Sequence, residues 1–373
     1  MSNYVSAHPH RLALATVAVF RGIGSSETEA RLIADNLVLA NLTGHDSHGV
    51  GLVPLYLEGV RAGIVQVNQK PELVADADVM LALDGRMGFG QVIGHEAMEL
   101  GIRRVHEHGI CLVATRNSHH LSRIGHWGEQ CARTGYVSTQ YVNTLGLPPL
   151  VAPYGGSDAR VATNPYCAAV PSPDGHPVVL DMATSKIALG KARVAMNKGV
   201  AVEDDTLIDA DGEPTNDPSV MYQDPIGAIL PFGGHKGYGL GIIAELLAGA
   251  LSGGGTYNAG TVITKVIHNN MLSIIFDPGR LGGTHWRKDI SRFIDWVKAS
   301  PLGRSAEGVL MAGEPERIAH RACGTLEERN SYRRSILGGN QRGRPRRRRL
   351  SGRPGGCPDR MILLFPQHAR ARQ

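Results

Sequence analysis

Apolar positions along the chain follow two periods, one typical of helices and one typical of strands. Several long segments repeat at helical spacing, and a Ser-x-x-Glu capping box at 26–29 opens one of them. The predicted helices span 27–42, 91–107, 123–134, 184–196, 236–252 and 286–298. Short apolar runs bounded by polar or glycine residues predict strands at 79–83, 109–115, 136–142, 177–181 and 271–276. Because these strands alternate with helices, the pattern indicates an α/β fold.

The order of these elements divides the 373 residues into four parts. We expect a helical segment over 1–70, an α/β body over 71–300, a closing segment over 301–328 and a tail over 329–373. The apolar run at 12–20 is short for a signal peptide and lacks a small-residue cleavage site. No run reaches the length of a membrane span. The expected location is therefore the cytoplasm.

Charge is divided unevenly between the body and the tail. Residues 329–373 contain thirteen arginines, no lysine and one acid, Asp359, which gives this segment a charge of +12. Since the whole chain is at +5, residues 1–328 carry −7. The arginine run at 342–349 could bind nucleic acid or a membrane surface, but no aromatic residue interrupts it for base stacking. We expect a disordered tail, which could also come from a shift of reading frame.

Composition and cysteine spacing are those of a globular protein with reduced thiols. Hydrophobic residues make up 42% of the chain and charged residues 20%, which is ordinary for a folded domain. The cysteines are odd in number and have no CxxC spacing, so a disulfide framework is not expected. They are Cys111, Cys131, Cys167, Cys323 and Cys357.

The most informative polar segment is the turn at 43–50. It places Ser47 and His48 between glycines, directly after the helix predicted at 27–42. A histidine is the usual group for proton transfer near neutral pH, and an adjacent hydroxyl can orient it or hold a substrate oxygen. The same segment could instead be a helix C-cap with solvated polar residues.

Three further turns repeat this arrangement at other element ends. His119 and His120 follow a predicted strand, where α/β proteins place catalytic groups. Asp181 ends another strand, although Asp, Thr and Ser there could equally cap the next helix. Glycines and Lys236 lie in the turn at 230–239, ahead of an apolar helix. Free N–H groups, the helix dipole and an ammonium would favour a phosphate there.

Six segments carry a resemblance to a known family. They are GHDSHGVG (44–51), NSHH (117–120) with RIGHW (123–127), VAPYGG (151–156), TNPYC (163–167), LDMATS (180–185) and PFGGHKGYGL (231–240). Together they resemble the type 2 malate/L-lactate dehydrogenase family over residues 10–320. The resemblance implies a homodimer that transfers a hydride between nicotinamide and a 2-hydroxy or 2-oxo acid. It also implies a non-Rossmann, mixed-sheet NAD(P)-binding domain, beside a helical domain built from the N-terminal segment and late helices.

The resemblance also implies roles for individual residues. His48 is the first candidate for the proton donor in reduction and acceptor in oxidation, with Ser47 orienting it or the substrate. His120 is the competing candidate. Asp181 would orient a histidine, or raise its pKa by holding the imidazolium form. The residues implied at NAD or NADP are Asn143, Asp181, Met182, Ala183, His235, Lys236 and Gly237.

The substrate side of the site departs from the family pattern. Many members carry an arginine two residues after the SHGV motif, where this chain has Leu52. An apolar pocket of Leu52, Pro54 and Tyr56 would suit a larger or aromatic 2-oxo acid, such as a phenylpyruvate. Arg123 is the nearest substitute for gripping the substrate carboxylate, unless it forms a surface salt bridge.

A glycine-rich loop at 88–94 looks like a Rossmann phosphate loop, but we expect it to be a structural turn. It lies between a predicted strand and a predicted helix, and Arg116 would suit a 2′-phosphate. The acidic residue expected at the next strand end for the ribose is absent, however. We expect Gly88 and Gly90 to let the strand-to-helix turn close tightly.

Parts of the sequence are also compatible with functions of other kinds. Asp46, His48, His119, His120 and His126 could hold a metal ion, but they lack the HExxH arrangement and a thiolate, so no metal is expected. The basic tail could make the chain a nucleic-acid-binding protein. Among enzymes, a cyclic imine reductase is the alternative, because an imine carbon also accepts a hydride. The expected partner is a small 2-hydroxy or 2-oxo acid, with neither nucleic acid nor membrane.

Overall fold

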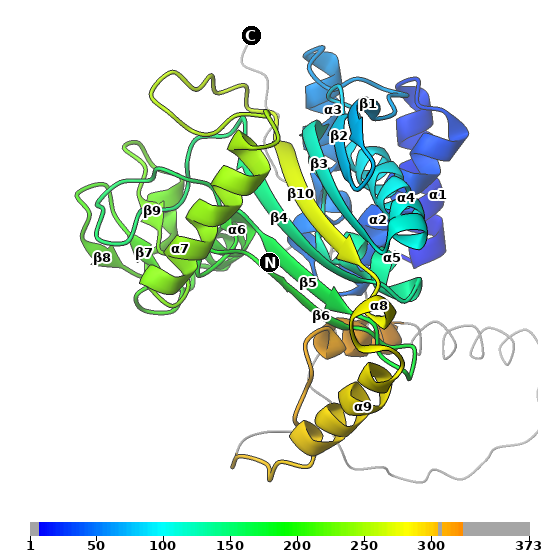
Figure 1. Ribbon diagram of the computed structural model, residues 1–373. Coiled ribbons are helices and arrows are strands. Elements are labelled where there is room, and N and C mark those ends of the chain that lie inside the picture. Colours follow the sequence, from blue (N-terminus) through cyan, green and yellow to red (C-terminus); the bar gives the residue numbers. More distant parts are fainter. Residues whose placement is uncertain (1–6, 305–307, 324–373) are drawn as a thin grey trace, which may run out of the picture.

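The computed structural model describes residues 7–304 and 308–323 (Figure 1). The predictions for the arginine-rich tail and for Cys357 lie outside these residues. A seven-stranded sheet with the order β1-β2-β3-β10-β4-β5-β6 forms the centre of the molecule. Its strands are β1 (Glu72–Ala77), β2 (Met80–Asp84), β3 (Ile110–His119), β4 (Val137–Leu145), β5 (Tyr166–Val170), β6 (Val178–Met182) and β10 (His268–Phe276).

The sheet is mixed, as the family resemblance implied. β2 and β3 pair in parallel, whereas β1 with β2, β3 with β10, β10 with β4, β4 with β5 and β5 with β6 pair antiparallel. The five predicted strands are present as β2, β3, β4, β6 and β10. β1 and β5 were not predicted. The six residues of β1 are all exposed, so burial gave no hydrophobic pattern there.

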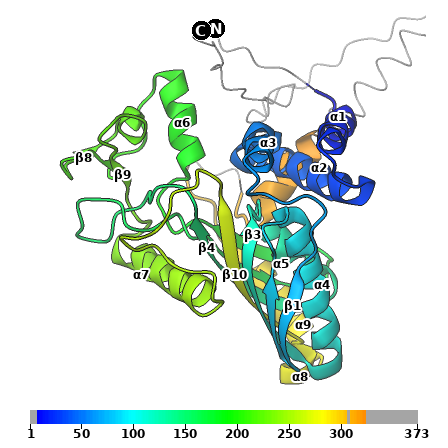
Figure 2. The same ribbon diagram turned by 90° about the horizontal axis from the view of Figure 1, so that it is seen from above.

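Two helices cover one face of this sheet, α4 (Gly90–His108) and α5 (Gly125–Arg133) (Figure 2). They pack closely because glycines lie at the contacts. A Cβ at Gly94 would lie 2.6 Å from the Trp127 ring, and one at Gly101 would lie 2.7 Å from Ile275. Cys111, Cys131 and Cys167 are free thiols buried in this core.

The N-terminal helices form a second core beside the sheet. They are α1 (Pro9–Gly22), α2 (Glu27–Leu42) and α3 (Val53–Arg61). Phe20, Tyr56 and Phe89 meet at the centre of this core through ring contacts. Only half of the predicted capping box is formed, since Ser26 accepts from the Glu29 N–H while the Glu29 carboxylate is bound elsewhere. Among the described residues, the helices are too short or too polar to cross a membrane.

A smaller lobe lies on the other side of the sheet. It contains α6 (Leu189–Lys198), η3 (Pro218–Met221) and the short strands β7 (Leu207–Ile208), β8 (Pro214–Thr215) and β9 (Ala228–Ile229). Next to it, α7 (His235–Ala244) continues as the π-helical η4 (Glu245–Ala250). The prediction of a helix from residue 184 is wrong at its start. Residues 184–188 are irregular instead, with bends and a bridge from Ser185 to Pro231, because Thr184 and Lys186 bond to Phe232 and Leu230.

The last described elements are α8 (Gly279–Gly282), α9 (His285–Lys298) and the segment 308–323. α9 projects from the body in Figure 1, and none of its residues is buried. The following segment returns to the sheet edge, where Val179 N donates to Ala312 O (3.1 Å) and Arg317 donates to Pro177 O (2.9 Å).

Candidate active site

The turn after α2 is a rigid structure made of η1 (Asp46–His48) and η2 (Val50–Leu52). Asn41, in the last turn of α2, donates to Asp46 (2.6 Å) and accepts from the Val50 N–H (2.9 Å). A Cβ at Gly49 would lie 2.2 Å from the Asn41 side chain, so glycine is required at that position. Asn41 therefore fixes the segment that carries His48, which is more than a solvated C-cap.

The structure brings His48 and His120 together. Their rings are stacked with centroids 5.6 Å apart and planes 24° apart. Ser47 Oγ lies 3.0 Å from His48 Nδ1, and Ser122 Oγ donates to the His48 carbonyl (3.2 Å). Two motifs far apart in the sequence thus meet where β3 ends against the turn that carries His48.

Glycine and asparagine residues hold the backbone of His120 in place. A Cβ at Gly90 would lie 2.1 Å from the His120 carbonyl oxygen, so the start of α4 rests directly on this strand end. This contact supports the interpretation of the loop at 88–94 as a tight turn. On the other side, Asn269 accepts from the Leu121 N–H (2.8 Å).

Sequence reasoning missed the partners of the His120 side chain. Tyr56 Oη lies 2.8 Å from His120 Nδ1, and Gln91 Nε2 donates to Tyr56 Oη (3.0 Å). Tyr56 is fully buried, so its ring belongs to the N-terminal core, and the apolar pocket suggested beside Leu52 stays a prediction. Leu52 likewise packs against the N-terminal core. The missed signal was a polar group, Tyr56 or Gln91, among the apolar residues of α3 and of the first turn of α4.

Burial favours the neutral form of both candidate histidines. It lowers the pKa of His48 to about 4, and electrostatic interactions with His45 and Arg123 act in the same direction. Burial also lowers the pKa of His120 well below its usual value, with His48 and His119 adding to the shift. Neutral imidazoles can accept a proton, which suits the oxidation of an alcohol.

Arg123 lies in a buried cluster of charges. It is 4% exposed, donates to Glu129 (2.6 Å) and lies 3.9 Å from Asp181 Oδ2. The suggested surface salt bridge is therefore a buried one. Asp181 accepts from the Gly125 N–H (2.7 Å), and burial raises the pKa of its carboxyl. Arg123 and Asp181 face each other here, and the Nδ1 partner of His120 is Tyr56.

The residues predicted at the cofactor fall into two groups. Asp181, Met182 and Ala183 lie at the end of β6, which leads to the extended segment bonded to the turn before α7. That turn carries the second set of residues. These are the exposed His235 and Lys236 and the buried Gly237.

Asn143 lies apart from both groups. Its amide donates to Gly255 O (3.0 Å) and accepts from Asn270 (2.9 Å), and both asparagines are fully buried. These bonds tie β4 and β10 to the chain that follows η4.

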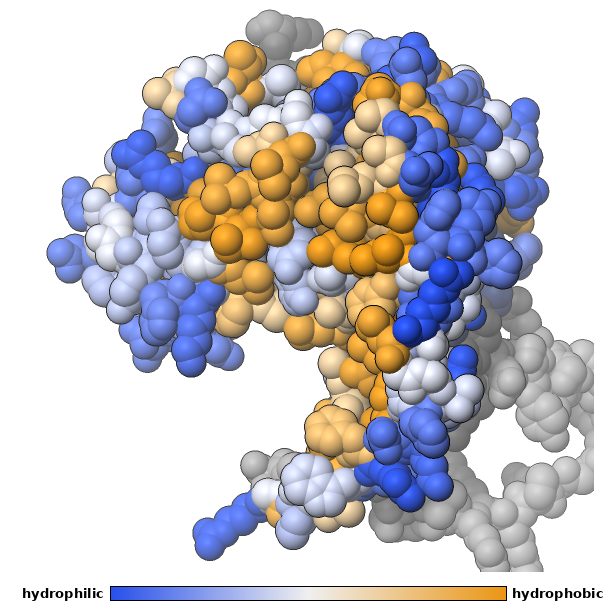
Figure 3. All heavy atoms as spheres, in the orientation of Figure 1, coloured by the Kyte–Doolittle hydropathy of each residue, from blue (hydrophilic) through white to orange (hydrophobic). Residues whose placement is uncertain are grey.

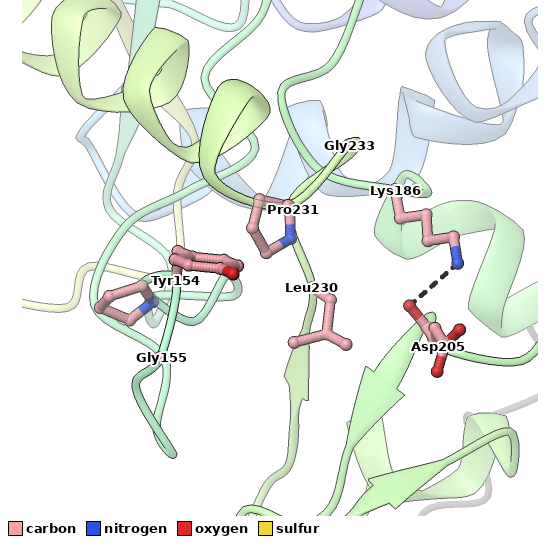
Figure 4. Close-up of a pocket in the computed structure, with 9 residues that line it drawn as sticks. Tyr154, Gly155, Lys186, Asp205, Leu230, Pro231 and Gly233 are labelled. Atoms are coloured by element: carbon pink, nitrogen blue, oxygen red, sulfur yellow. Dashed lines mark hydrogen bonds between the residues drawn. The ribbon is translucent and has the colours of Figure 1, made fainter.

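An apolar cleft of about 510 Å³ opens beside the glycine turn (Figure 4). Tyr154, Leu230 and Pro231 line it together with Gly233 and Gly234. At its rim, the Lys186 ammonium donates to the carbonyls of Asp204 (2.8 Å) and Asp205 (3.0 Å). The N-terminus of α7 has no side-chain cap.

The histidines considered for metal binding are engaged in other ways. His119 is fully buried, with its ring 4.4 Å from that of Tyr56, and His126 packs on Trp127. Within residues 7–304 and 308–323, no group of three or more His, Cys, Asp or Glu is arranged to hold a metal ion.

Comparison with known proteins gives one consistent result. The family model of malate/L-lactate dehydrogenase matches residues 8–325. Hydroxycarboxylate dehydrogenase B of Escherichia coli K12 is 48% identical over 301 residues, which cover 80% of this chain and 83% of that protein. A solved E. coli structure described as of malate/lactate dehydrogenase type is 45% identical, with a TM-score of 0.82 over 85% of this chain and 89% of its own.

A second solved structure widens the chemistry of these relatives. The Δ1-piperideine-2-carboxylate reductase of Pseudomonas syringae pv. tomato is 28% identical. Its TM-score is 0.71 over 85% of this chain and 99% of its own. Motifs, fold and both levels of similarity agree, and this chain belongs to the malate/L-lactate dehydrogenase family.

Proposed function

We propose that this chain is an NAD(P)-dependent 2-hydroxy acid dehydrogenase that acts on the CH–OH group. The observation that carries the proposal is the His48–His120 pair, in which burial favours the neutral imidazoles where the motifs at 44–51 and 117–120 meet. The similarity to hydroxycarboxylate and malate/L-lactate dehydrogenases supports the same substrate class.

The residues beside the glycine turn fit a dinucleotide. The uncapped start of α7 and the exposed Lys236 would attract a phosphate, and the apolar cleft at Tyr154 would accept a flat ring. Asp181, Met182 and Ala183 would line the path from this cleft toward the histidines. We propose that the cofactor binds on this mixed sheet rather than at a Rossmann loop.

A bound nicotinamide would supply the hydride acceptor for alcohol oxidation. The protein supplies the proton acceptor, because neutral His48 can take the hydroxyl proton while Ser47 holds its other nitrogen. In the reverse direction, an anionic 2-oxo acid beside His48 would raise the pKa of this imidazole and allow it to return the proton. Arg123 is kept as the proposed substrate cation, although Glu129 already binds it.

The test is a cofactor-absorbance assay with a panel of 2-oxo acids, 2-hydroxy acids and cyclic imines, each with NADH or NADPH, or with the oxidised forms. We expect turnover of 2-oxo acids with at least one cofactor. Turnover of cyclic imines alone would favour the imine reductase, for which the Pseudomonas structure is the supporting observation. No turnover with any member of the panel would contradict the proposal.

A separate experiment tests the proposed cofactor-binding site. Lys236→Ala should weaken cofactor binding and leave the turnover number nearly unchanged at saturation, because its proposed partner is an anion away from the reacting carbon. Lys191→Ala, at another exposed lysine, is the control. A parental dissociation constant with depressed turnover would point to a substrate role.

The proposal includes a homodimer in the cytoplasm. Leu251, Phe293 and Trp296 are exposed at 72%, 58% and 74%, and Figure 3 shows apolar side chains gathered over the face that carries α7. Apolar surface of this kind is typical of protein interfaces. A second copy of the chain would cover it.

A further inference from the structure

The hydroxyl groups that contact the two catalytic histidines differ in what they can do. Ser47 Oγ has His48 Nδ1 as its one side-chain partner among the described residues, so its hydrogen can rotate. It can donate to a neutral His48 and accept from a protonated one. His48 therefore keeps a hydrogen-bond partner in both protonation states.

Tyr56 offers no such freedom. Its oxygen accepts the amide hydrogen of Gln91 at 3.0 Å, which directs its own hydrogen toward His120 Nδ1 at 2.8 Å. Tyr56 and Gln91 are both fully buried, so water does not compete for these bonds. Burial also raises the pKa of Tyr56, and the phenol stays protonated.

The rings around Tyr56 hold the hydroxyl in this direction. His119 meets the Tyr56 ring edge-on with centroids 4.4 Å apart, and Phe89 stacks on it at 6.1 Å. Both ring nitrogens of His119 are buried without a hydrogen-bond partner in the described structure. His119 thus acts as an aromatic spacer between β3 and α3.

We propose that Gln91 and Tyr56 are positioning residues that lock His120 in its neutral Nε2–H tautomer, and that His48 alone carries the transferred proton. His120 then donates a hydrogen bond from Nε2 to the substrate oxygen and is not deprotonated. In alcohol oxidation, the hydroxyl proton passes to His48 and the C–H hydride to the nicotinamide. The reverse reaction returns both. This inference rests on the proposed function.

The electrostatic surroundings of His120 also favour the neutral form of its ring. The titratable groups facing His120 are His48 from η1, its neighbour His119, and Tyr56 from α3. Not one of them is an anion that would stabilise an imidazolium. An O–H donated to Nδ1 adds to this preference, because it stabilises the neutral ring.

The first test reads the tautomer directly and needs no activity. Long-range proton–nitrogen spectra of the full chain labelled with ¹⁵N-histidine should show the Nε2–H form at neutral pH, assigned by the signal that disappears in His120→Gln. An Nδ1–H tautomer, or an imidazolium at pH 7, would overturn the proposal. This outcome is independent of which substrate the enzyme accepts.

The second test is Tyr56→Phe, which removes the donor to Nδ1. We expect the pKa of His120 to rise and kcat to fall about ten- to hundredfold, with a smaller change in KM. Gln91→Glu should also raise this pKa, since a carboxylate would take the Tyr56 hydrogen and leave its oxygen to accept from Nδ1–H. A fall of the pKa in either variant would mean that the chain of hydrogen bonds runs the other way.

Tyr136→Phe is the matched control. Its hydroxyl also meets a histidine nitrogen, His106 Nδ1 at 3.5 Å, but on an exposed surface. The control should leave kcat and the tautomer of His120 unchanged. If it lowered kcat as much as Tyr56→Phe does, the loss would not come from the lock.

Discussion

The histidine site and helix α9 are built in opposite ways. At the site, polar groups find their partners within the same chain, as Asn41, Ser47 and Tyr56 show. On α9, large apolar side chains such as Phe293 and Trp296 are exposed and stack mainly on each other. The difference is the basis for the proposed homodimer, because the site is satisfied within one chain and the apolar surface of α9 is not covered by it.

The largest expected effect tests whether the site is complete as described. His48→Ala should lower turnover by about two to four orders of magnitude while cofactor binding stays nearly intact, as for a lost acid–base group. Stopped-flow assays and a cofactor titration would measure the two quantities. Turnover within tenfold of the parent would remove His48 from the mechanism.

His120→Ala is the companion variant. The tautomer lock predicts a smaller loss than for His48→Ala, because a hydrogen-bond donor is removed and the proton acceptor stays. If its loss were much larger, the two histidines would have to exchange roles.

The next effect concerns the buried charges behind the site. Arg123→Gln leaves the largely buried Asp181 carboxylate without its cation and Glu129 with only the exposed Arg133, which should lower the free energy of unfolding by about 3–5 kcal/mol. Denaturant unfolding would measure this change. Arg133→Gln, which removes an exposed partner of the same Glu129, should cost less than about 1 kcal/mol. A raised KM with unchanged stability would instead support Arg123 as the substrate clamp.

Acid should destabilise the histidine site before it affects α9. The pKa values of His48 and His126 are about 4 and that of His119 about 3, against about 6.5 in the unfolded chain. The unfolded state therefore takes up protons first as the pH falls. The free energy of unfolding that these histidines contribute above pH 6.5 is lost as the pH falls toward 4. Each histidine contributes a slope of up to about 1.4 kcal/mol per pH unit.

Calorimetry between pH 7 and 4 would measure this slope. The raised pKa of Asp181 and Glu245 acts in the opposite sense and offsets part of the loss. His119→Gln should make the slope shallower. An unfolding temperature that stays constant over this range would show that the histidines are not held neutral.

Sequence alone could predict the elements whose burial is periodic. α2 begins and ends where the pattern placed it, because Ile33, Leu37 and Ala40 all face one core. β5 has five residues, as do the predicted β2 and β6, but Ala168 and Ala169 at its centre have little preference for strands. Composition as well as length therefore limits what a local pattern predicts.

The site was predicted only as far as its motifs reach. His48, His120 and Asp181 came from segments rich in chemistry, whereas Tyr56 and Gln91 lie among apolar residues of α3 and α4. Tyr56 and His120 are 64 residues apart in the chain, and no local period encodes that contact. Partners of this kind become visible only once the helices are packed.

The smallest expected effect on the stability of the folded chain concerns the exposed apolar surface of α9. Trp296→Glu places a carboxylate on the exposed apolar surface of α9, so the free energy of unfolding of one chain should change by less than about 0.5 kcal/mol. The homodimer should dissociate, because burying an unpaired carboxylate in an interface is costly. Light scattering during size-exclusion chromatography would measure the mass.

Lys288→Glu, an exposed charge change on the same helix, should leave the dimer intact. A mass unaffected by Trp296→Glu would mean that α9 lies outside the dimer interface, and a monomeric parent would contradict the homodimer itself.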